Sequence, residues 1–228
     1  LFWFLEYRKG LSLRDTSIDL IKKIISYDTT SRNSNLELIH FIRDYLKDLG
    51  IESLLVHDDA GTKANLYATL GPADRPGILL SGHTDVVPID GQDWHTDPFN
   101  VVEKDAKLFG RGTCDMKSFV AICLAYAPKF LERGLKIPIH FAFSHDEEVG
   151  CVGVRTLIAK LANEIQPKPM MCIVGEPTLM QVIIGHKGKM SYQCHVRGLE
   201  AHSSLAPQGV NAVEYAAELI AYLKGMAR

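Results

Sequence analysis

Three short, continuous apolar runs constrain this chain more than any other feature, because each ends on a residue that can bind a metal or carry a proton. They are residues 77–82 before His83, residues 137–144 before Asp146-Glu147-Glu148, and residues 170–175 before Glu176. Such runs are typical of strands buried on both faces, as in parallel sheets. In an open α/β sheet, sites form beyond the carboxyl ends of the strands. The three runs therefore predict one shared site.

Helices are predicted around these strands from the spacing of apolar residues. The predicted helices cover residues 18–25, 35–49, 116–133, 152–165 and 209–226, and two more strands are expected near residues 51–56 and 66–70. We expect Asp15 or Thr16 to cap the first helix and Gly50 to stop the second. The alternation predicts the α/β class, with a largely parallel mixed sheet flanked by helices.

The pattern changes after about residue 185, where glycines punctuate an alternating stretch at residues 190–197. We predict a catalytic domain over residues 14–189 and the beginning of an α+β lid or dimerisation domain over residues 190–228. Neither part has a natural end, so we expect the chain to be truncated at its C-terminus. We assign no function to residues 1–13. Their short apolar opening lacks the basic-then-apolar order of a secretory signal.

Composition argues against several classes of function. The formal net charge of −2 gives no electrostatic reason to expect nucleic acid or a membrane surface as a partner. No apolar run reaches the roughly 20 residues that span a bilayer. The 5 cysteines are widely spaced and form no CxxC motif. This favours free thiols in a reducing compartment, and we expect a cytoplasmic protein.

His83 and Asp85 form the first candidate pair. If the strand continues to residue 85, the two side chains point to the same face. His83 can then bind a metal through one ring nitrogen, while Asp85 holds the other nitrogen or fixes the ring through a neighbour. The alternative, a turn histidine beside a solvated aspartate, is disfavoured by the convergence of the three strand ends.

The acidic candidates also have alternative interpretations. Asp115, in a glycine-rich loop before a helix, can cap that helix or bridge two metal ions roughly 3.5–4 Å apart. Of Glu147 and Glu148, one can bind metal while the other takes a proton from water, although such pairs are common on surfaces. Glu176 is placed at a strand edge by the proline that follows it. One imidazole with several carboxylates suits Zn²⁺, with Mn²⁺ or Co²⁺ as substitutes.

The segments at residues 81–88, 110–117, 146–148 and 175–178 resemble the motifs of the co-catalytic zinc amidohydrolases. That family includes deacetylases, desuccinylases, aminoacylases and glutamate carboxypeptidases. Later segments are similar to the acetylornithine deacetylase subgroup; they are residues 186–188, 202–204 and 209–214, with residues 30–32 and Asn65 also fitting. The resemblance covers about residues 14–228. It implies hydrolysis of N-acetyl-L-ornithine in arginine biosynthesis by a homodimer.

The resemblance also implies metal ligands. His83, Asp115 and Glu176 would hold one Zn²⁺, and Asp115 and Glu148 a second. Cys114 stands where the family usually has alanine, which we expect to be tolerated. The family's final ligand to the second zinc, a histidine from a late segment, has no counterpart here. We therefore expect one complete and one incomplete zinc site, and a chain that is inactive or impaired by itself.

Three catalytic roles are implied in the same way. Glu147 would be the general base that deprotonates the bridging water and later protonates the leaving amine. Asp85 would orient His83, and His202, reaching a partner subunit, would stabilise the oxyanion. A surface or loop histidine is the alternative for His202. The peptide bond after Asp115 is expected to be cis.

Two other functions remain open. One is a sibling hydrolase of the family, such as a succinyl-diaminopimelate desuccinylase, another N-acyl-amino-acid hydrolase or a carboxypeptidase. The other is a non-enzymatic relative that keeps the fold for binding. The presence of Glu147 argues against the second, because a metal site alone needs no spare base.

Overall fold

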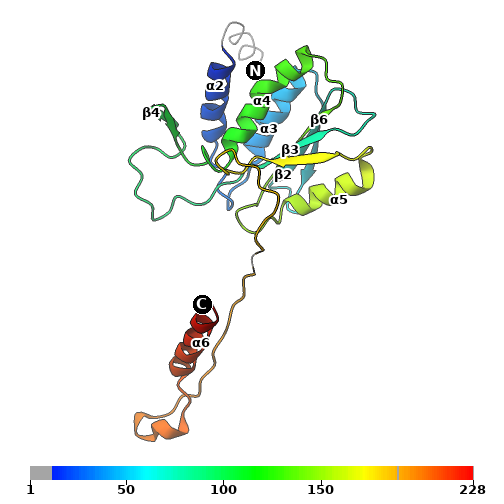
Figure 1. Ribbon diagram of the computed structural model, residues 1–228. Helices are drawn as coiled ribbons and strands as arrows, with labels where there is room; N and C mark the ends of the chain where they lie inside the picture. The colour runs from blue at the N-terminus through cyan, green and yellow to red at the C-terminus, as the bar shows by residue number, and fades with distance from the viewer. Residues whose placement is uncertain (1–11, 189, 228) are drawn as a thin grey trace. The chain divides into compact units, whose positions relative to one another are not determined.

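The computed structural model describes residues 12–188 and 190–227, and the chain divides into two compact units between Gln181 and Val182. The apolar opening at residues 1–5 lies outside the described residues. The first unit is a five-stranded sheet with helices on both faces (Figure 1). The second contains one 3₁₀ helix and one α-helix. The functions predicted for the two parts of the chain stay predictions.

The sheet mixes parallel and antiparallel pairing in the order β1-β2-β6-β3-β7. The strands are β1 (Ser53–His57), β2 (Ala64–Leu70), β3 (Ile78–His83), β6 (Ile139–Ser144) and β7 (Met171–Val174). β3 pairs in parallel with both β6 and β7, while β1–β2 and β2–β6 are antiparallel. The predicted α/β class with a mixed sheet is confirmed. The three parallel strands are those that end at or before His83, the Glu147-Glu148 pair and Glu176.

Helices lie on both faces of the sheet (Figure 1). On one face α3 (Leu36–Asp48) and α4 (Lys117–Glu132) contact the strands, and α2 (Leu13–Ile25) packs on α4. α5 (Val154–Glu164) lies on the opposite face. Successive side chains of β6 point to opposite faces of the sheet. Phe141 and Phe143 pack in the main core, whereas Ala142 packs with Leu157 of α5. Both faces of this central strand are therefore buried.

β7 corrects the expectation of three doubly buried strands. Met171 is 50% exposed, Ile173 45% and Val174 57%. β7 is at the edge of the sheet among the described strands, so its apolar composition indicates neither a central position nor burial. The prediction for the first helix cap was also wrong. Ser12 is the N-cap of α2: its hydroxyl oxygen accepts a hydrogen bond from the Asp15 backbone amide, and the hydroxyl donates one to the Asp15 carboxylate.

A short hairpin in the first unit was not predicted from the sequence. It consists of β4 (Val102–Lys104) and β5 (Lys107–Phe109), which pair antiparallel. Its residues are largely exposed and mixed in polarity, so neither strand shows the apolar pattern that marks the main sheet.

The second unit consists of η1 (Ser203–Gln208) and α6 (Ala212–Met226), which Asn211 caps. The alternating residues 190–197 form no strand among the described residues, and an isolated bridge joins Leu199 to Val210. None of the described helices is both long and apolar enough to cross a membrane.

Candidate metal centre

The parallel register brings the predicted site residues to one edge of the sheet. His83, the last residue of β3, pairs with Ser144, the last residue of β6, so Glu147 and Glu148 follow immediately beyond this edge. The backbone amide of Gly175 donates to the Ser81 carbonyl of β3, which places the segment after β7 at the same edge. The strand ends therefore converge as the sequence predicts.

His83 lies at the centre of the group. Its Nε2 is 3.1 Å from an Asp115 oxygen, 3.7 Å from a Glu176 oxygen and 4.0 Å from a Glu147 oxygen. Two sets of possible metal ligands share this histidine, each with its ligand atoms within 4.8 Å of one another: His83 with Asp115 and Glu176, and His83 with Glu147 and Glu148. The first set is the trio predicted for one zinc. The second contains Glu147, for which the family resemblance implies the role of general base and not that of metal ligand.

The other ring nitrogen of His83 is held by backbone. Nδ1 donates to the Asp85 carbonyl oxygen at 2.9 Å, while the nearest Asp85 carboxylate oxygen is 3.5 Å away. A hydrogen bond at Nδ1 leaves Nε2 directed at the acidic group, as metal-binding histidines require. Burial by itself would lower the pKa of His83, but the Asp85 and Glu176 carboxylates raise it to about 9.

The carboxylate of Asp85 mainly holds other groups. It accepts hydrogen bonds from the Ser31 hydroxyl at 2.7 Å and from the backbone amides of Glu147 at 3.1 Å and Glu148 at 3.2 Å. Burial raises the pKa of Asp85, but the nearby His83 ring and the hydrogen bonds from Ser31 and the Glu147 amide outweigh it and keep the pKa below its usual value. Asp85 is therefore an ionised anchor for the segment that carries the two glutamates.

Ser31 was not singled out as a site residue from the sequence. The available signal was the resemblance of residues 30–32 to the deacetylase subgroup, and nothing in local periodicity connects Ser31 with Asp85, 54 residues away. An isolated parallel bridge between Thr30 and Val86 brings the two segments together.

Asp115 lies in the loop before α4 and does not cap that helix. The N-cap is Met116, which makes no side-chain capping hydrogen bond, so the capping interpretation of Asp115 was wrong. The Asp115–Met116 peptide bond is cis, as expected. Gly112 in this loop has a φ of +83°, and a Cβ there would lie 2.9 Å from Val86. Both constraints require glycine where the loop turns toward the site.

Two of the acidic residues, Glu148 and Glu176, have a raised pKa. Burial raises the pKa of Glu148 and of Glu176, and the Asp115 and Glu147 carboxylates raise both further. Carboxylates this close repel each other unless positive charge lies among them. The donor set of one imidazole and several carboxylates suits a divalent cation such as Zn²⁺, Mn²⁺ or Co²⁺. The residues present therefore fit a metal centre.

His202 belongs to the second unit and makes local contacts there. It is the N-cap of η1, where Nδ1 accepts from the Ser204 amide at 3.2 Å and hydrogen-bonds the Ser204 hydroxyl at 2.8 Å. The side chain is exposed. Its role at the oxyanion stays a prediction.

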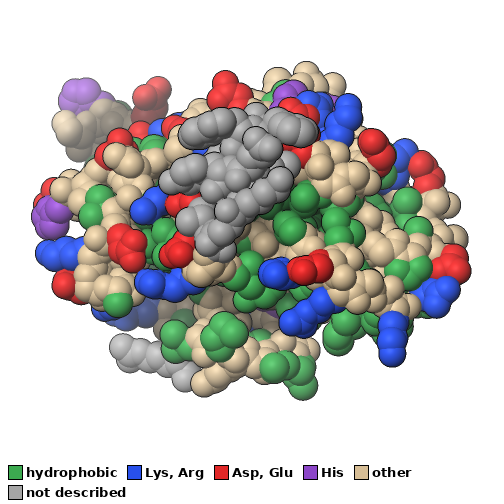
Figure 2. All heavy atoms as spheres, turned by 90° about the horizontal axis from the view of Figure 1, so that it is seen from above, with side chains coloured by type: hydrophobic (Ala, Val, Ile, Leu, Met, Phe, Trp, Pro, Cys, Tyr) green, Lys and Arg blue, Asp and Glu red, His purple; other side chains and the backbone are tan. Residues whose placement is uncertain are grey.

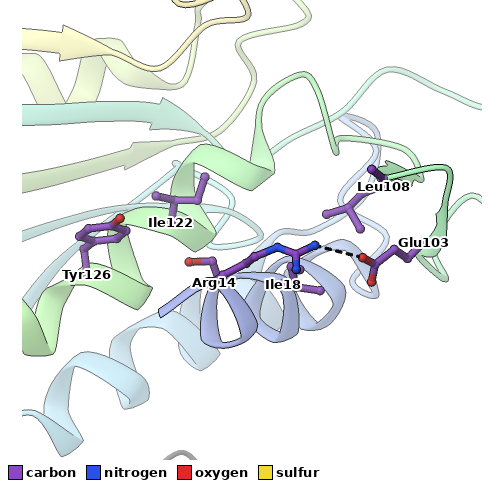
Figure 3. Close-up of a pocket in the computed structure, with 8 residues that line it drawn as sticks. Arg14, Ile18, Glu103, Leu108, Ile122 and Tyr126 are labelled. Carbon is purple, nitrogen blue, oxygen red and sulfur yellow. Dashed lines mark ion pairs between the residues drawn. The ribbon is translucent and has the colours of Figure 1, made fainter. Parts of the chain in front are cut away.

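A separate pocket of about 350 Å³ is formed by residues of α2, α4 and the β4–β5 hairpin (Figure 3). Its lining includes Ile18, Ile122 and Tyr126, and an ion pair of 3.6 Å joins Arg14 to Glu103 beside them. None of the candidate metal or catalytic residues lines this pocket. The candidate site at the strand ends is therefore separate from this cavity.

The chain is similar in sequence to a family of known proteins. The sequence model of peptidase family M20/M25/M40 matches residues 79–226. The acetylornithine deacetylase of Proteus mirabilis (strain HI4320) is 38% identical over 216 residues, which are 91% of this chain and 54% of that protein. The acetylornithine deacetylase of Pasteurella multocida (strain Pm70) is 36% identical over 202 residues, 88% of this chain and 52% of that protein. The chain thus spans about half the length of the curated relatives it matches.

The crystal structure of human carnosine dipeptidase 1 is also similar. It superposes with a TM-score of 0.62 and 25% sequence identity, covering 76% of this chain and 40% of that one. The family match begins on β3, includes all the candidate metal and catalytic residues, and extends into α6. On the match of sequence and the likeness of fold together, the chain belongs to peptidase family M20/M25/M40.

Proposed function

We propose that the chain provides the metal centre of an enzyme that hydrolyses N-acetyl-L-ornithine to L-ornithine and acetate. The observation that carries this proposal is the convergence of Asp115, Glu147 and Glu176 on the Nε2 atom of His83. The identity of 36–38% with two acetylornithine deacetylases, over most of this chain, supports the substrate. The proposed enzyme is a metal-dependent amidohydrolase.

Zn²⁺ is the proposed metal, with Co²⁺ or Mn²⁺ as substitutes. His83, Asp115 and Glu176 would hold one ion. Asp115 and Glu148 would hold a second, completed by a residue that is not among those described. When bound, such ions lower the pKa of water to roughly 7 and polarise the carbonyl under attack.

Glu147 is the proposed general base. Its side chain is 38% exposed, so it is accessible to a water molecule and a substrate, unlike His83 beside it. The carboxylate would take a proton from the attacking water and deliver it to the amine that leaves. Proton transfer of this kind contributes about 10²–10⁴-fold to the rate. Asp85 would position Glu147 by accepting hydrogen bonds from the backbone amides of residues 147 and 148.

His202 is proposed to donate a hydrogen bond to the oxyanion in the active site of a partner subunit. Losing one such donor typically costs about 10²–10³ in rate. This role requires a homodimer, which we include in the proposal. A cytoplasmic location and a place in arginine biosynthesis follow from the proposed substrate.

The proposed partner is a small N-acyl amino acid. On the face shown in Figure 2, basic and acidic side chains are interspersed among the described residues and gather into no large patch of one sign. The formal net charge of −2 agrees with this distribution. We therefore propose neither nucleic acid nor a membrane as a partner.

A sibling hydrolase is the second candidate. The likeness to human carnosine dipeptidase 1 favours it, because the same sheet and site would then serve a peptide bond. A succinyl-diaminopimelate desuccinylase, another N-acyl-amino-acid hydrolase or a carboxypeptidase would use the same residues in the same roles. A non-enzymatic relative is less consistent with the position of Glu147 beside His83.

The test compares three substrates on the full-length protein loaded with zinc: N-acetyl-L-ornithine, N-succinyl-diaminopimelate and a dipeptide. We expect the highest kcat/KM on N-acetyl-L-ornithine. A higher value on either of the others would replace the substrate but keep the metal centre. No hydrolysis of any of them would contradict the proposed function.

A further inference from the structure

Lys63 makes two contacts beside the candidate metal centre that the proposed mechanism does not use. Its Nζ donates to the Asp146 carboxylate at 2.5 Å and to the Ser31 carbonyl oxygen at 2.5 Å. The side chains of Lys63 and Asp146 are each 15% exposed. The pair is therefore much less hydrated than the other Lys/Arg ion pairs of the described residues, whose side chains are 33–74% exposed.

The turn before β2 holds Lys63 in place. Asp58 accepts hydrogen bonds from the backbone amides of Thr62 at 2.7 Å and of Lys63 at 2.8 Å, and from the Thr62 hydroxyl at 3.0 Å. The Lys63 carbonyl in turn accepts from the Asp58 amide at 3.0 Å. The backbone of Lys63 is thus fixed at both its amide and its carbonyl, which reduces the entropy lost when the side chain forms its contacts.

Asp146 precedes Glu147 directly and has a φ of +56°, in the left-handed region. One of its carboxylate oxygens contacts Lys63, and the other lies 3.1 Å from Nδ1 of the buried His145. This conformation is uncommon for residues other than glycine, although aspartate adopts it more readily than most. The Lys63 contact constrains the side chain of a residue in this conformation.

Two anchors therefore hold the segment that carries the catalytic glutamate. Asp85 binds the backbone amides of Glu147 and Glu148, and Lys63 binds the side chain of Asp146, immediately before them. Both anchors also contact Ser31: its hydroxyl donates to Asp85 and its carbonyl accepts from Lys63. Ser31 links the two.

We infer that Lys63 is a positioning residue, which sets the placement of the Glu147 carboxylate by holding Asp146. The inference rests on the proposed function, because it assigns Lys63 a part in the reaction of Glu147. A general base displaced by about 1 Å can lose about 10²-fold in rate. Loss of the Lys63 contact should therefore lower kcat by about 10- to 100-fold, with little change in KM, because Lys63 contacts Asp146 and Ser31, to which the proposed mechanism gives no part in binding substrate.

The first experiment measures kcat and KM of Lys63→Met, Lys63→Arg and Lys160→Met in the full-length zinc-loaded protein. Lys63→Met keeps the aliphatic stem and removes the charge, and Lys63→Arg restores a donor to Asp146. Lys160→Met is the matched control, since it removes an ion pair of 2.7 Å with Glu164 on the surface of α5. We expect a fall in kcat for Lys63→Met, substantial rescue in Lys63→Arg, and no change in Lys160→Met.

A second variant covers the case in which Lys63→Met does not fold. Asp146→Asn keeps the shape of the side chain and removes its charge, so it should lower kcat in the same way. Where Lys63→Met does fold, its effect should be much smaller in the Asp146→Asn background, because the two residues act through one contact.

Amide hydrogen exchange gives a result that does not depend on turnover. The backbone amides of residues 146–150 should exchange at least about tenfold faster in Lys63→Met than in the wild type. Their exchange rate in Lys160→Met should equal that of the wild type. Wild-type kcat together with wild-type exchange in Lys63→Met would overturn the inference, as would a rise in KM at unchanged kcat. If the wild-type protein hydrolyses no substrate, the proposed function fails, and exchange alone decides whether Lys63 holds this segment.

Discussion

The carboxylate of Asp85 accepts a hydrogen bond from the backbone amide of Glu147 at 3.1 Å. This contact joins the end of β3 to the segment after β6, two strands that lie side by side in parallel. A residue expected only to orient a histidine thereby also holds the proposed general base. The neighbouring amide of Glu148 and the hydroxyl of Ser31 bind the same carboxylate.

Replacing Asp85 by Ala should destabilise the protein. The change leaves two backbone amides without their acceptor, and each unsatisfied buried group costs about 1–3 kcal/mol. Urea denaturation of the metal-free protein measures the loss. Ser31→Ala is the matched comparison, because it removes one donor and leaves both amides bound; it should cost less. Equal losses in the two variants would show that the amide contacts contribute little.

Glu147→Gln should abolish most of the turnover while metal stays bound. Glutamine keeps the size of the side chain and cannot accept the proton, so a fall of about 10²–10⁴-fold is expected. Metal content by atomic absorption, measured beside hydrolysis, separates the two roles open to this residue. If Glu147→Gln also lost metal, the set of His83, Glu147 and Glu148 would describe true ligands.

His83→Ala should remove metal binding, because both possible ligand sets share this histidine. The protein should retain no stoichiometric zinc after dialysis against a weak chelator. The control is His95→Ala, since His95 is an exposed histidine of the same unit. Zinc retained equally by both variants would exclude His83 as a ligand.

Metal affinity should depend on pH up to about pH 9. In the metal-free protein burial lowers the pKa of His83, but the carboxylates of Asp85 and Glu176 outweigh this effect and raise the pKa to about 9. The ring is therefore protonated near pH 7 and must release a proton to bind metal. Affinity should rise about tenfold per pH unit below 9 and then level. Calorimetry of metal binding in two buffers of different ionisation enthalpy measures the number of protons released on binding. A plateau already reached near pH 6.5 would contradict the raised pKa.

The same titration predicts a stability change without metal. Because the folded pKa of His83 lies above the unfolded value of 6.5, its contribution to stability is complete below pH 6.5. That contribution is lost as the pH rises through about 9. Urea midpoints of the chelated protein across this range measure it, and His83→Ala should flatten the dependence.

The sequence predicted the convergence of His83, Glu148 and Glu176 because buried parallel strands have a recognisable composition and their carboxyl ends share an edge. The exposure of β7 could not be predicted in this way. Ile173 and Val174 are apolar whether a strand is central or at an edge, and only the pairing order distinguishes the two.

Ser31 and Lys63 could not be predicted for a different reason. Their partners, Asp85 and Asp146, are 54 and 83 residues away in the chain. Such contacts leave no trace in helical or strand periodicity, which reports only neighbours within a few residues. The N-cap of α2 was predicted wrongly for another reason. Ser12, Asp15 and Thr16 are all acceptable capping residues, and the sequence alone does not distinguish among them.

The order of strands in the sheet has a consequence for how the protein reaches its native state. β3 lies between β6 and β7, whose partner residues follow it by about 60 and about 90 positions in the chain. Pairings over such distances form late and slowly, since long loops must close first. Glu147 and Glu176, which follow β6 and β7, should therefore reach His83 only when these pairings form, so the uptake of a metal ion during refolding would report the completion of the sheet.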